Sequence, residues 1–160
     1  IDISVSLVEM VDQEFHSRFD AKKRSYLYFL TNSKTPFYYK YSSFYSNADK
    51  VDLAKLNNLS KHLLGKHDFT SFCRKISEVE NKICEIYNIH WRKSGNFLIF
   101  HVEANRFLHG MVKALVGTLL NLYDCNKDGN ELLQILKEKD REKAGMAFPS
   151  KGLFLFKVRY

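Results

Sequence analysis

The most regular hydrophobic pattern in the chain lies between residues 108 and 120. Apolar side chains recur there at positions i, i+3, i+4 and i+7, which is the spacing that places them on one face of a helix. They are Leu108, Met111, Val112, Leu115, Val116, Leu119 and Leu120. The pattern predicts the main core helix of the protein, and Asn105 offers it an N-cap.

One shorter helix is predicted on each side of the main helix. Before it, leucines recur at helical spacing, with N-cap oxygens on Asn47 and Asp49 and a stop at Gly65. These leucines are Leu53, Leu56, Leu63 and Leu64. After the main helix, the sequence from about Asp128 to Lys139 is expected to form the third.

Period-2 alternation and β-branched or aromatic enrichment predict the strands. The predicted strands are Tyr26–Thr31, Ile83–Trp91, Phe97–Ala104 and Gly152–Tyr160. The segment Asn32–Pro36 ends the first strand, and Ser94–Asn96 is a turn signal that joins the next two as an antiparallel hairpin. The last strand has an apolar face made of Phe154, Phe156, Val158 and Tyr160. Because strands and helices mix without a strict βαβ alternation, we predict an α+β fold whose largely antiparallel β-sheet is packed by helices.

The composition fits one compact domain with a polyanionic partner. With 160 residues, of which 45% are hydrophobic, the chain can bury a real core. Its longest apolar stretch, Met111–Tyr123, is shorter than the roughly 20 residues of a membrane-spanning helix, so we expect a soluble protein with no membrane partner. Three cysteines without a paired spacing favour a reducing, cytoplasmic setting. A net charge of +7 makes a polyanion the first partner to test.

Aromatic and basic side chains are interleaved between Phe15 and Tyr41, where Asp20 is the one acidic residue. Taken singly, each Tyr or Phe is best explained as a strand or core residue. Together with nearby cations they suit nucleic acid, because unpaired bases stack on aromatic rings while Lys and Arg neutralise phosphates. These cations are Arg18, Lys22, Lys23 and Arg24. The segment predicts RNA or DNA binding and, by itself, no reaction.

A second stripe follows the main helix opposite its apolar face. It consists of Arg106, His109, Gly110, Lys113 and Gly117. The glycines would let a partner approach closely, and the cationic or titratable residues would meet it. The alternative is an ordinary solvated helix face, but such a face favours Ala, Lys or Glu over Gly.

The sequence lacks the usual signatures of metal and nucleotide sites. Its histidines and cysteines show no H-E-x-x-H or knuckle spacing, so we expect no metal site. There is also no G-x-x-x-x-G-K-[ST], no G-x-G-x-x-G and no G-x-S-x-G segment.

Four separate blocks of the sequence resemble one known family, the bacterial tRNA pseudouridine synthase A type. The family's blocks are F-H-x-R-F-x-A followed by Y-x-Y, then D-F-T-S-F, N-x-F-L-x-x-M-V-R and G-L-x-L. Here they correspond to Phe15–Ala21 with Arg24–Tyr28, His67–Phe72, Asn105–Lys113 and Gly152–Leu155. Any one block would be a weak signal, but four in the right order and spacing make the resemblance strong.

The resemblance implies a cofactor-free isomerase, a homodimer that converts uridine to pseudouridine in the anticodon stem-loop of tRNA. It assigns Tyr26 to stacking on the extruded base, Lys113 to pairing with a catalytic aspartate, and Leu153 to packing nearby. These roles agree with physical chemistry, since a flipped base needs a flat platform and a buried carboxylate needs a counter-charge. We expect the RNA to be bound also by Arg18, Lys22, Lys23, Arg24, Arg106 and His109.

The chain departs from the family's pattern in two ways. The family's nucleophile lies in a G-R-T-D-A-G segment before the matched blocks, and no aspartate of this chain has that context. We therefore interpret residues 1–160, which begin without Met, as the C-terminal domain of such an enzyme and one half of its fold, inactive alone. The second departure is Lys113, where the family commonly has Arg, because an ammonium lacks the planar two-pronged fork of a guanidinium.

Two other hypotheses stay open at this point. A non-catalytic RNA-binding module would explain the charge and the interleaved aromatic and basic residues. A purely structural dimerisation domain, with incidental positive charge, is the weaker alternative.

Overall fold

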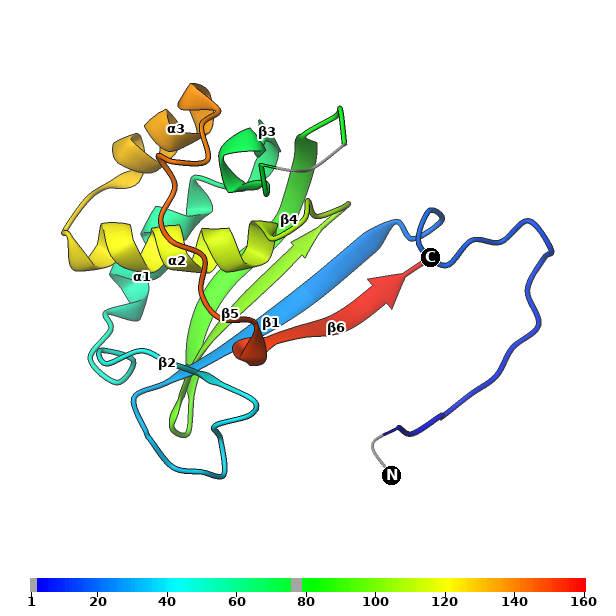
Figure 1. The fold of residues 1–160 in the computed structure, drawn as a ribbon, viewed down its shortest axis with the longest axis horizontal. Coiled ribbons are helices and arrows are strands. Elements are labelled where there is room, and N and C mark those ends of the chain that lie inside the picture. Colours follow the sequence, from blue (N-terminus) through cyan, green and yellow to red (C-terminus); the bar gives the residue numbers. More distant parts are fainter. Residues whose placement is uncertain (1–2, 76–78) are drawn as a thin grey trace.

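A six-stranded sheet and three helices form the body of the protein in the residues that the structure describes, 3–75 and 79–160 (Figure 1). The structure is a computed structural model. The strands are β1 (Lys23–Thr31), β2 (Ser43–Phe44), β3 (Gly65–Asp68), β4 (Ile83–Ser94), β5 (Phe97–Ala104) and β6 (Leu153–Arg159). The helices are α1 (Leu53–Lys61), α2 (Met111–Asp124) and α3 (Gly129–Glu138), with short 3₁₀ helices η1 (Thr70–Phe72) and η2 (Ser150–Gly152).

The sheet is antiparallel except for one short parallel pair. Its strand order is β2-β1-β5-β4-β3, and β6 also pairs with β1. Strand β2 runs parallel to the end of β1 at Leu30 and Thr31, whereas β6 pairs antiparallel with Lys23–Tyr28. The predicted α+β fold with a largely antiparallel sheet is confirmed.

The helices enclose the core against the sheet. Tyr28 of β1 and Phe100 of β5 are completely buried, in one cluster with Leu56 of α1 and Leu115 of α2. Buried polar groups in a core need hydrogen-bond partners. For example, the indole N–H of Trp91 on β4 donates to the hydroxyl of Ser60 on α1 at 2.8 Å.

Several predicted elements are confirmed in detail. The hairpin of β4 and β5 turns at Gly95, whose φ of 54° lies in the left-handed region that tight hairpin turns require. Helix α3 begins after Asp128, whose side chain forms a reciprocal capping box with Glu131.

The predicted start of α1 is wrong. Its N-cap is Asp52, whose carboxylate accepts hydrogen bonds from the backbone N–H groups of Ala54 and Lys55. The oxygens of Asn47 and Asp49 lie too early in the chain for this role. The helix also ends at Lys61, three residues before the predicted end.

The predicted start of α2 is wrong as well. Asn105 is not its N-cap, because the Oδ1 of Asn105 accepts the backbone N–H of Glu85 on β4 at 2.9 Å. The helix begins at Met111, after Gly110 with a φ of 77°. Residues 105–110 therefore form a turn rather than the first part of the helix.

Strand β3 is not predicted by the sequence pattern. Gly65, expected to be only a helix stop, is its first residue, with a φ of 88°. The strand pairs antiparallel with Ile83–Ile86 of β4. The segment Gly65–Asp68 holds no β-branched residue, and its only ring is the imidazole of His67. It therefore carries no strand signal of its own.

Strand β6 is present, but its apolar face is not buried. A register shift at Ser25 and Tyr26 of β1 interrupts the alternation. Phe156 is 61% exposed and Tyr160 is 54% exposed. The apolar side chains of this strand are therefore left largely uncovered by the rest of the body.

Residues 3–14 lead away from the body (dark blue in Figure 1). Among the described residues, no helix combines the length and the apolar character needed to cross a membrane.

Candidate functional site

Two adjoining hollows open where β1, the turn before α2 and the start of β6 meet. Their volumes are about 670 and 400 Å³, and they share Arg18, Tyr26 and Phe107. The larger is lined by Arg18, Phe19, Ala21, Arg24, Tyr26, Val79, Asn105, Arg106 and Phe107. The smaller is lined by Arg18, Tyr26, Phe107, Leu108, His109, Gly110, Met111, Val112, Lys113 and Leu153. We call the joined space the Tyr26 cleft.

The cleft brings together most of the residues expected to form the site. It gathers Tyr26, Lys113, Leu153, Arg18, Arg24, Arg106 and His109 from segments far apart in the sequence. It does not include Lys22 or Lys23. The backbone N–H of Lys22 bonds to the carbonyl of Arg159, and the Lys23 ammonium lies 4.6 Å from the centre of the Tyr87 ring.

Tyr26 and Leu153 supply a flat ring and an apolar wall. The alternation of β1 turns Tyr26 toward the side covered by helices, and β6 places Leu153 opposite Tyr28 on the same edge. The ring of Phe107 meets that of Tyr26 at 88°, with 5.1 Å between the centroids. This contact fixes the orientation of Tyr26, which is half-buried and faces the cleft.

Lys113 projects into the same space from the first turn of α2. Its ammonium donates to the hydroxyl of Ser150 at 3.1 Å. The carbonyl of Lys113 also accepts the backbone N–H of Phe148 at 3.2 Å. Lys113 is thus held at both ends by the segment that leads into Leu153.

The turn of residues 105–110 places Arg106 and His109 at the cleft. These residues do not continue the face of α2, so the predicted helical stripe holds only for Lys113 and Gly117. The carbonyl of His109 accepts the backbone N–H of Arg74 at 3.0 Å, which ties the turn to the segment after η1. Gly110 serves the sharp turn into the helix, a conformation that few side chains tolerate.

Arg24 holds one wall of the cleft together. Its guanidinium donates to the carbonyls of Ala21 and Asn105 at 3.1 Å each, and also to the carbonyl of Arg18. Three donors of this rigid fork are therefore engaged by the backbone. The result is that Arg24 fixes the segment that carries Arg18 against the turn before α2.

The charge of the cleft is positive. Arg18, Arg24, Arg106 and Lys113 carry cations there, and no carboxylate lines it among the residues that the structure describes. Such a surface can hold a flat, uncharged ring between apolar walls and neutralise phosphates beside it. It offers no group among these lining residues that could act as a carboxylate nucleophile.

A thiol nucleophile is also absent from the described part of the cleft. The nearest candidate, Cys84 on β4, is buried outside the lining, and burial raises its pKa to about 11 in spite of the charge of Arg106. The thiol is therefore protonated at neutral pH and unreactive. Within residues 3–75 and 79–160, no three His, Cys, Asp or Glu side chains are placed to hold a metal ion.

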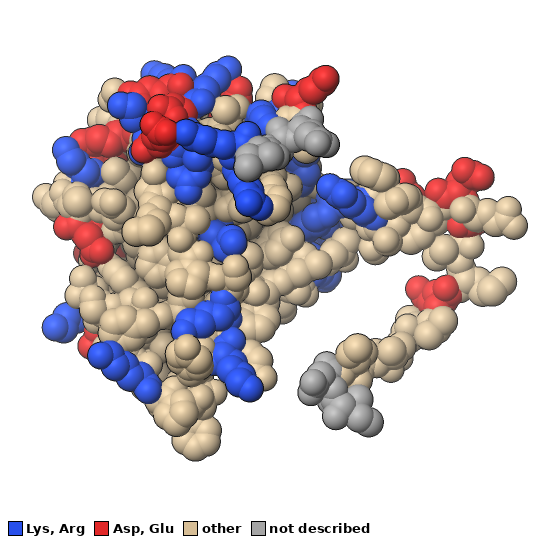
Figure 2. All heavy atoms as spheres, in the orientation of Figure 1, with Lys and Arg blue, Asp and Glu red and all other residues tan. Residues whose placement is uncertain are grey.

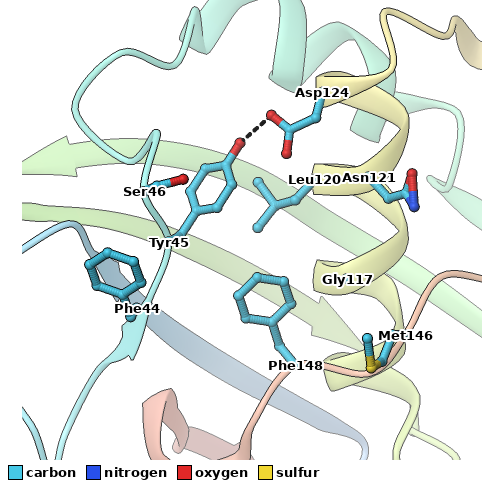
Figure 3. Close-up of a pocket in the computed structure, with 9 residues that line it drawn as sticks. All are labelled: Phe44, Tyr45, Ser46, Gly117, Leu120, Asn121, Asp124, Met146 and Phe148. Carbon is cyan, nitrogen blue, oxygen red and sulfur yellow. Dashed lines mark hydrogen bonds between the residues drawn. The ribbon is translucent and has the colours of Figure 1, made fainter.

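A separate hollow of about 520 Å³ lies along the second half of α2 (Figure 3). Tyr45 points across it and donates to the carboxylate of Asp124 at 2.7 Å. Burial, together with this carboxylate, raises the pKa of Tyr45. Gly117 lies on the wall of this hollow, and a β-carbon there would lie 1.9 Å from the carbonyl oxygen of Met146. The close approach predicted at Gly117 is thus made by the protein's own chain.

Sequence reasoning did not single out Phe107 in the lining of the Tyr26 cleft or Ser150 beside it. Phe107 lies within a matched block, and its position between two expected site residues could have drawn attention to it. Ser150 carries no signal, because only the fold brings η2 to Lys113.

Comparisons with known proteins point to one family. A family model described as tRNA pseudouridine synthase matches residues 59–160. The tRNA pseudouridine synthase A of Bacillus subtilis (strain 168) is 36% identical over 159 residues, which cover 99% of this chain and 64% of that protein. The proteins of the same name from Borrelia duttonii and Bacteroides fragilis are 33% and 36% identical and are covered over 65% and 63% of their lengths. The chain thus spans less than two thirds of these relatives.

Proposed function

The chain belongs to the tRNA pseudouridine synthase family, and we propose that it is the C-terminal domain of an enzyme that isomerises uridine to pseudouridine in tRNA. The observation that carries this proposal is the convergence of Tyr26, Lys113 and Leu153 on one cationic cleft. These are the three residues to which the family's motifs assign roles in the reaction.

The reaction exchanges one bond of the nucleoside for another. The bond between ribose C1′ and uracil N1 breaks, and a bond between C1′ and C5 forms. The proton on C5 leaves and N1 gains one, so that the product is an isomer of the substrate. No cofactor is required by this balance.

Six residues of the cleft have a part in this exchange in the proposal. Tyr26 stacks on the extruded uracil, and Leu153 closes the apolar side of its pocket. The ammonium of Lys113 pairs with the attacking carboxylate and keeps it ionised in a site from which water is excluded. Arg18, Arg106 and His109 lie where they can meet the phosphates on either side of the flipped nucleotide.

The carboxylate itself comes, in this proposal, from a part of the enzyme outside these 160 residues. Two findings support this assignment. No carboxylate lines the described part of the cleft, and the relatives are about half as long again as this chain. By itself the chain would then act as an RNA-binding module without chemistry.

The finer points of the proposal concern substrate position, assembly and location. The anticodon stem-loop is a suitable target, because loop nucleotides are extruded at lower cost than paired ones. The uncovered apolar side chains of β6 give a homodimer a surface to bury. Three free cysteines suit the reducing cytoplasm, where tRNA is found.

Nucleoside analysis tests the proposed function. The enzyme extended upstream of Ile1 is incubated with unmodified tRNA transcripts, which are then digested and analysed for pseudouridine. We expect pseudouridine in the anticodon stem-loop. If no pseudouridine forms in any transcript, the proposal is wrong.

A further inference from the structure

The loop between β1 and β2 displays three aromatic side chains to solvent. Phe37 is 83% exposed, Tyr39 is 68% exposed and Tyr41 is 62% exposed. We call residues 34–41 the aromatic loop. Exposed rings gathered in this way are costly to hydrate and mark a surface that meets a partner.

The aromatic loop is held in place by its own backbone and by one half-buried ring, that of Tyr38. The ring of Tyr38 packs on Phe97 of β5, with 4.8 Å between the centroids. The carbonyl of Tyr38 accepts the backbone N–H of Tyr41 at 3.0 Å and the hydroxyl of Ser42 at 2.8 Å. The exposed rings are thus displayed on an anchored turn. This lowers the conformational entropy that the loop loses when a partner binds.

Lysines surround these rings, and acidic side chains do not. Lys34 and Lys40 lie in the loop, and the sequence from Thr31 to Asn47 contains no Asp or Glu. The ammonium of Lys151, from η2, lies 3.9 Å from the centre of the Tyr39 ring. In Figure 2 most acidic side chains lie over α3, at the left side of the body and along the N-terminal segment, and basic side chains predominate at the lower end of the body where this loop lies.

Helix η2 links the Tyr26 cleft to the loop, since Ser150 contacts Lys113 and Lys151 contacts Tyr39. Lys151 follows Ser150, the partner of Lys113, and precedes Leu153 by two residues. A strand of RNA whose target base enters the cleft could therefore run past η2 and reach the loop with neighbouring nucleotides.

We propose that the aromatic loop is a second RNA-binding site, on which unpaired nucleotides near the target uridine stack. Phe37, Tyr39 and Tyr41 supply the stacking rings, and Lys34, Lys40 and Lys151 neutralise the phosphates. The identity of the nucleic acid as RNA rests on the proposed function. A second copy of this chain is a poorer occupant, because two such loops would bring like charges together.

Binding of a fluorescein-labelled oligouridylate to the 160-residue chain tests this site. Replacing all three rings (Phe37→Ser, Tyr39→Ser and Tyr41→Ser) should weaken binding by about tenfold or more, since each base that stacks on a ring contributes measurably. The slope of log affinity against log salt should not change, because the lysines remain. Phe156→Ser, which removes an equally exposed ring on β6, should leave the affinity within about twofold of the wild type.

Unchanged oligouridylate affinity in the triple variant would overturn the second site. If the triple substitution also converted a dimer to a monomer in sedimentation, the rings would be assigned to a protein interface. Because only binding is measured, the outcome does not depend on whether the enzyme makes pseudouridine. Conversely, full turnover by an extended enzyme with the triple substitution would contradict the proposal that the loop binds RNA. It would not contradict the proposed function.

Discussion

The ammonium of Lys113 donates a hydrogen bond to the hydroxyl of Ser150 at 3.1 Å and so joins the first turn of α2 to the segment before β6. Ser150 is a neutral acceptor, and it leaves the positive charge of Lys113 uncompensated. A carboxylate that enters the Tyr26 cleft would find this charge already positioned. In the proposed mechanism, Ser150 would thus hold Lys113 in place for a carboxylate that the described lining of the cleft does not provide.

Replacing Lys113 should separate the role of its charge from that of its hydrogen bond. In the extended enzyme, Lys113→Ala should lower kcat/KM by about a hundredfold, since an enclosed carboxylate left unpaired is strongly destabilised. Lys113→Arg keeps the charge and should retain most of the activity. Ser150→Ala is the matched control and should cost no more than about threefold. Equal losses in Lys113→Ala and Ser150→Ala would show that positioning, not charge, is what matters.

Replacing Tyr26 should weaken RNA binding only where the substitution removes its aromatic ring. Tyr26→Ala removes the stacking platform and should reduce the affinity of the chain for tRNA by about tenfold. Tyr26→Phe keeps the ring and should bind within about twofold of the wild type. Filter binding at fixed salt measures both, and equal affinity in all three proteins would remove Tyr26 from the binding surface.

Replacing Gly117 should destabilise the fold without touching the cleft. The β-carbon of alanine would lie 1.9 Å from the carbonyl oxygen of Met146, so the crossing segment must move. We expect Gly117→Ala to lower the free energy of unfolding by about 1–3 kcal/mol, the usual cost of overpacking. Urea unfolding measures the loss, with Asn121→Ala, an exposed position of the same helix, as the control.

Asp68 should make the fold sensitive to acid. Burial alone would raise the pKa of its carboxyl, but hydrogen bonds from Lys139 and Thr70 outweigh burial and hold the pKa below its usual value. Because the folded pKa is the lower one, the stabilisation is present above a pH of about 4 and is lost as the pH falls through the folded pKa. Both partners are partly exposed, so the contribution should be about 0.5 kcal/mol.

Urea midpoints at neutral and acid pH check this expectation. Asp68→Asn should be less stable than the wild type at pH 7, and the difference should vanish at low pH. Asp49→Asn, which replaces an exposed carboxyl, is the matched control. A difference between Asp68→Asn and wild type that persists in acid would contradict the assignment.

Most of the fold follows from patterns that are local in the sequence. The hairpin around Gly95 and the helix after Asp128 need only residues a few positions apart, and both predictions are confirmed. The starts of α1 and α2 were predicted wrongly for a different reason. Several polar residues could cap each helix, and only tertiary contacts, such as the bond from Glu85 to Asn105, decide which one does.

The residues of the candidate site likewise differ in whether the sequence alone could predict their position. Tyr26, Lys113 and Leu153 were found through sequence blocks, and the fold brings them to one cleft. Lys23 shares the composition of that region but not its position, because neighbours on a strand such as Lys23 and Arg24 point to different sides. Lys22 precedes β1 and does not line the cleft. Arg24 was expected to meet RNA, yet its guanidinium is engaged by three backbone carbonyls, which no pattern of charges could predict.

The release of tritium from tRNA labelled at C5 of uridine tests the central claim most directly. The 160-residue chain and the enzyme extended upstream of Ile1 are compared under conditions in which both bind tRNA. We predict tritium release by the extended enzyme and none by the chain alone, because the cleft needs a carboxylate from outside this chain. Tritium release by the purified chain would contradict the account, since a nucleophile would then lie within these 160 residues.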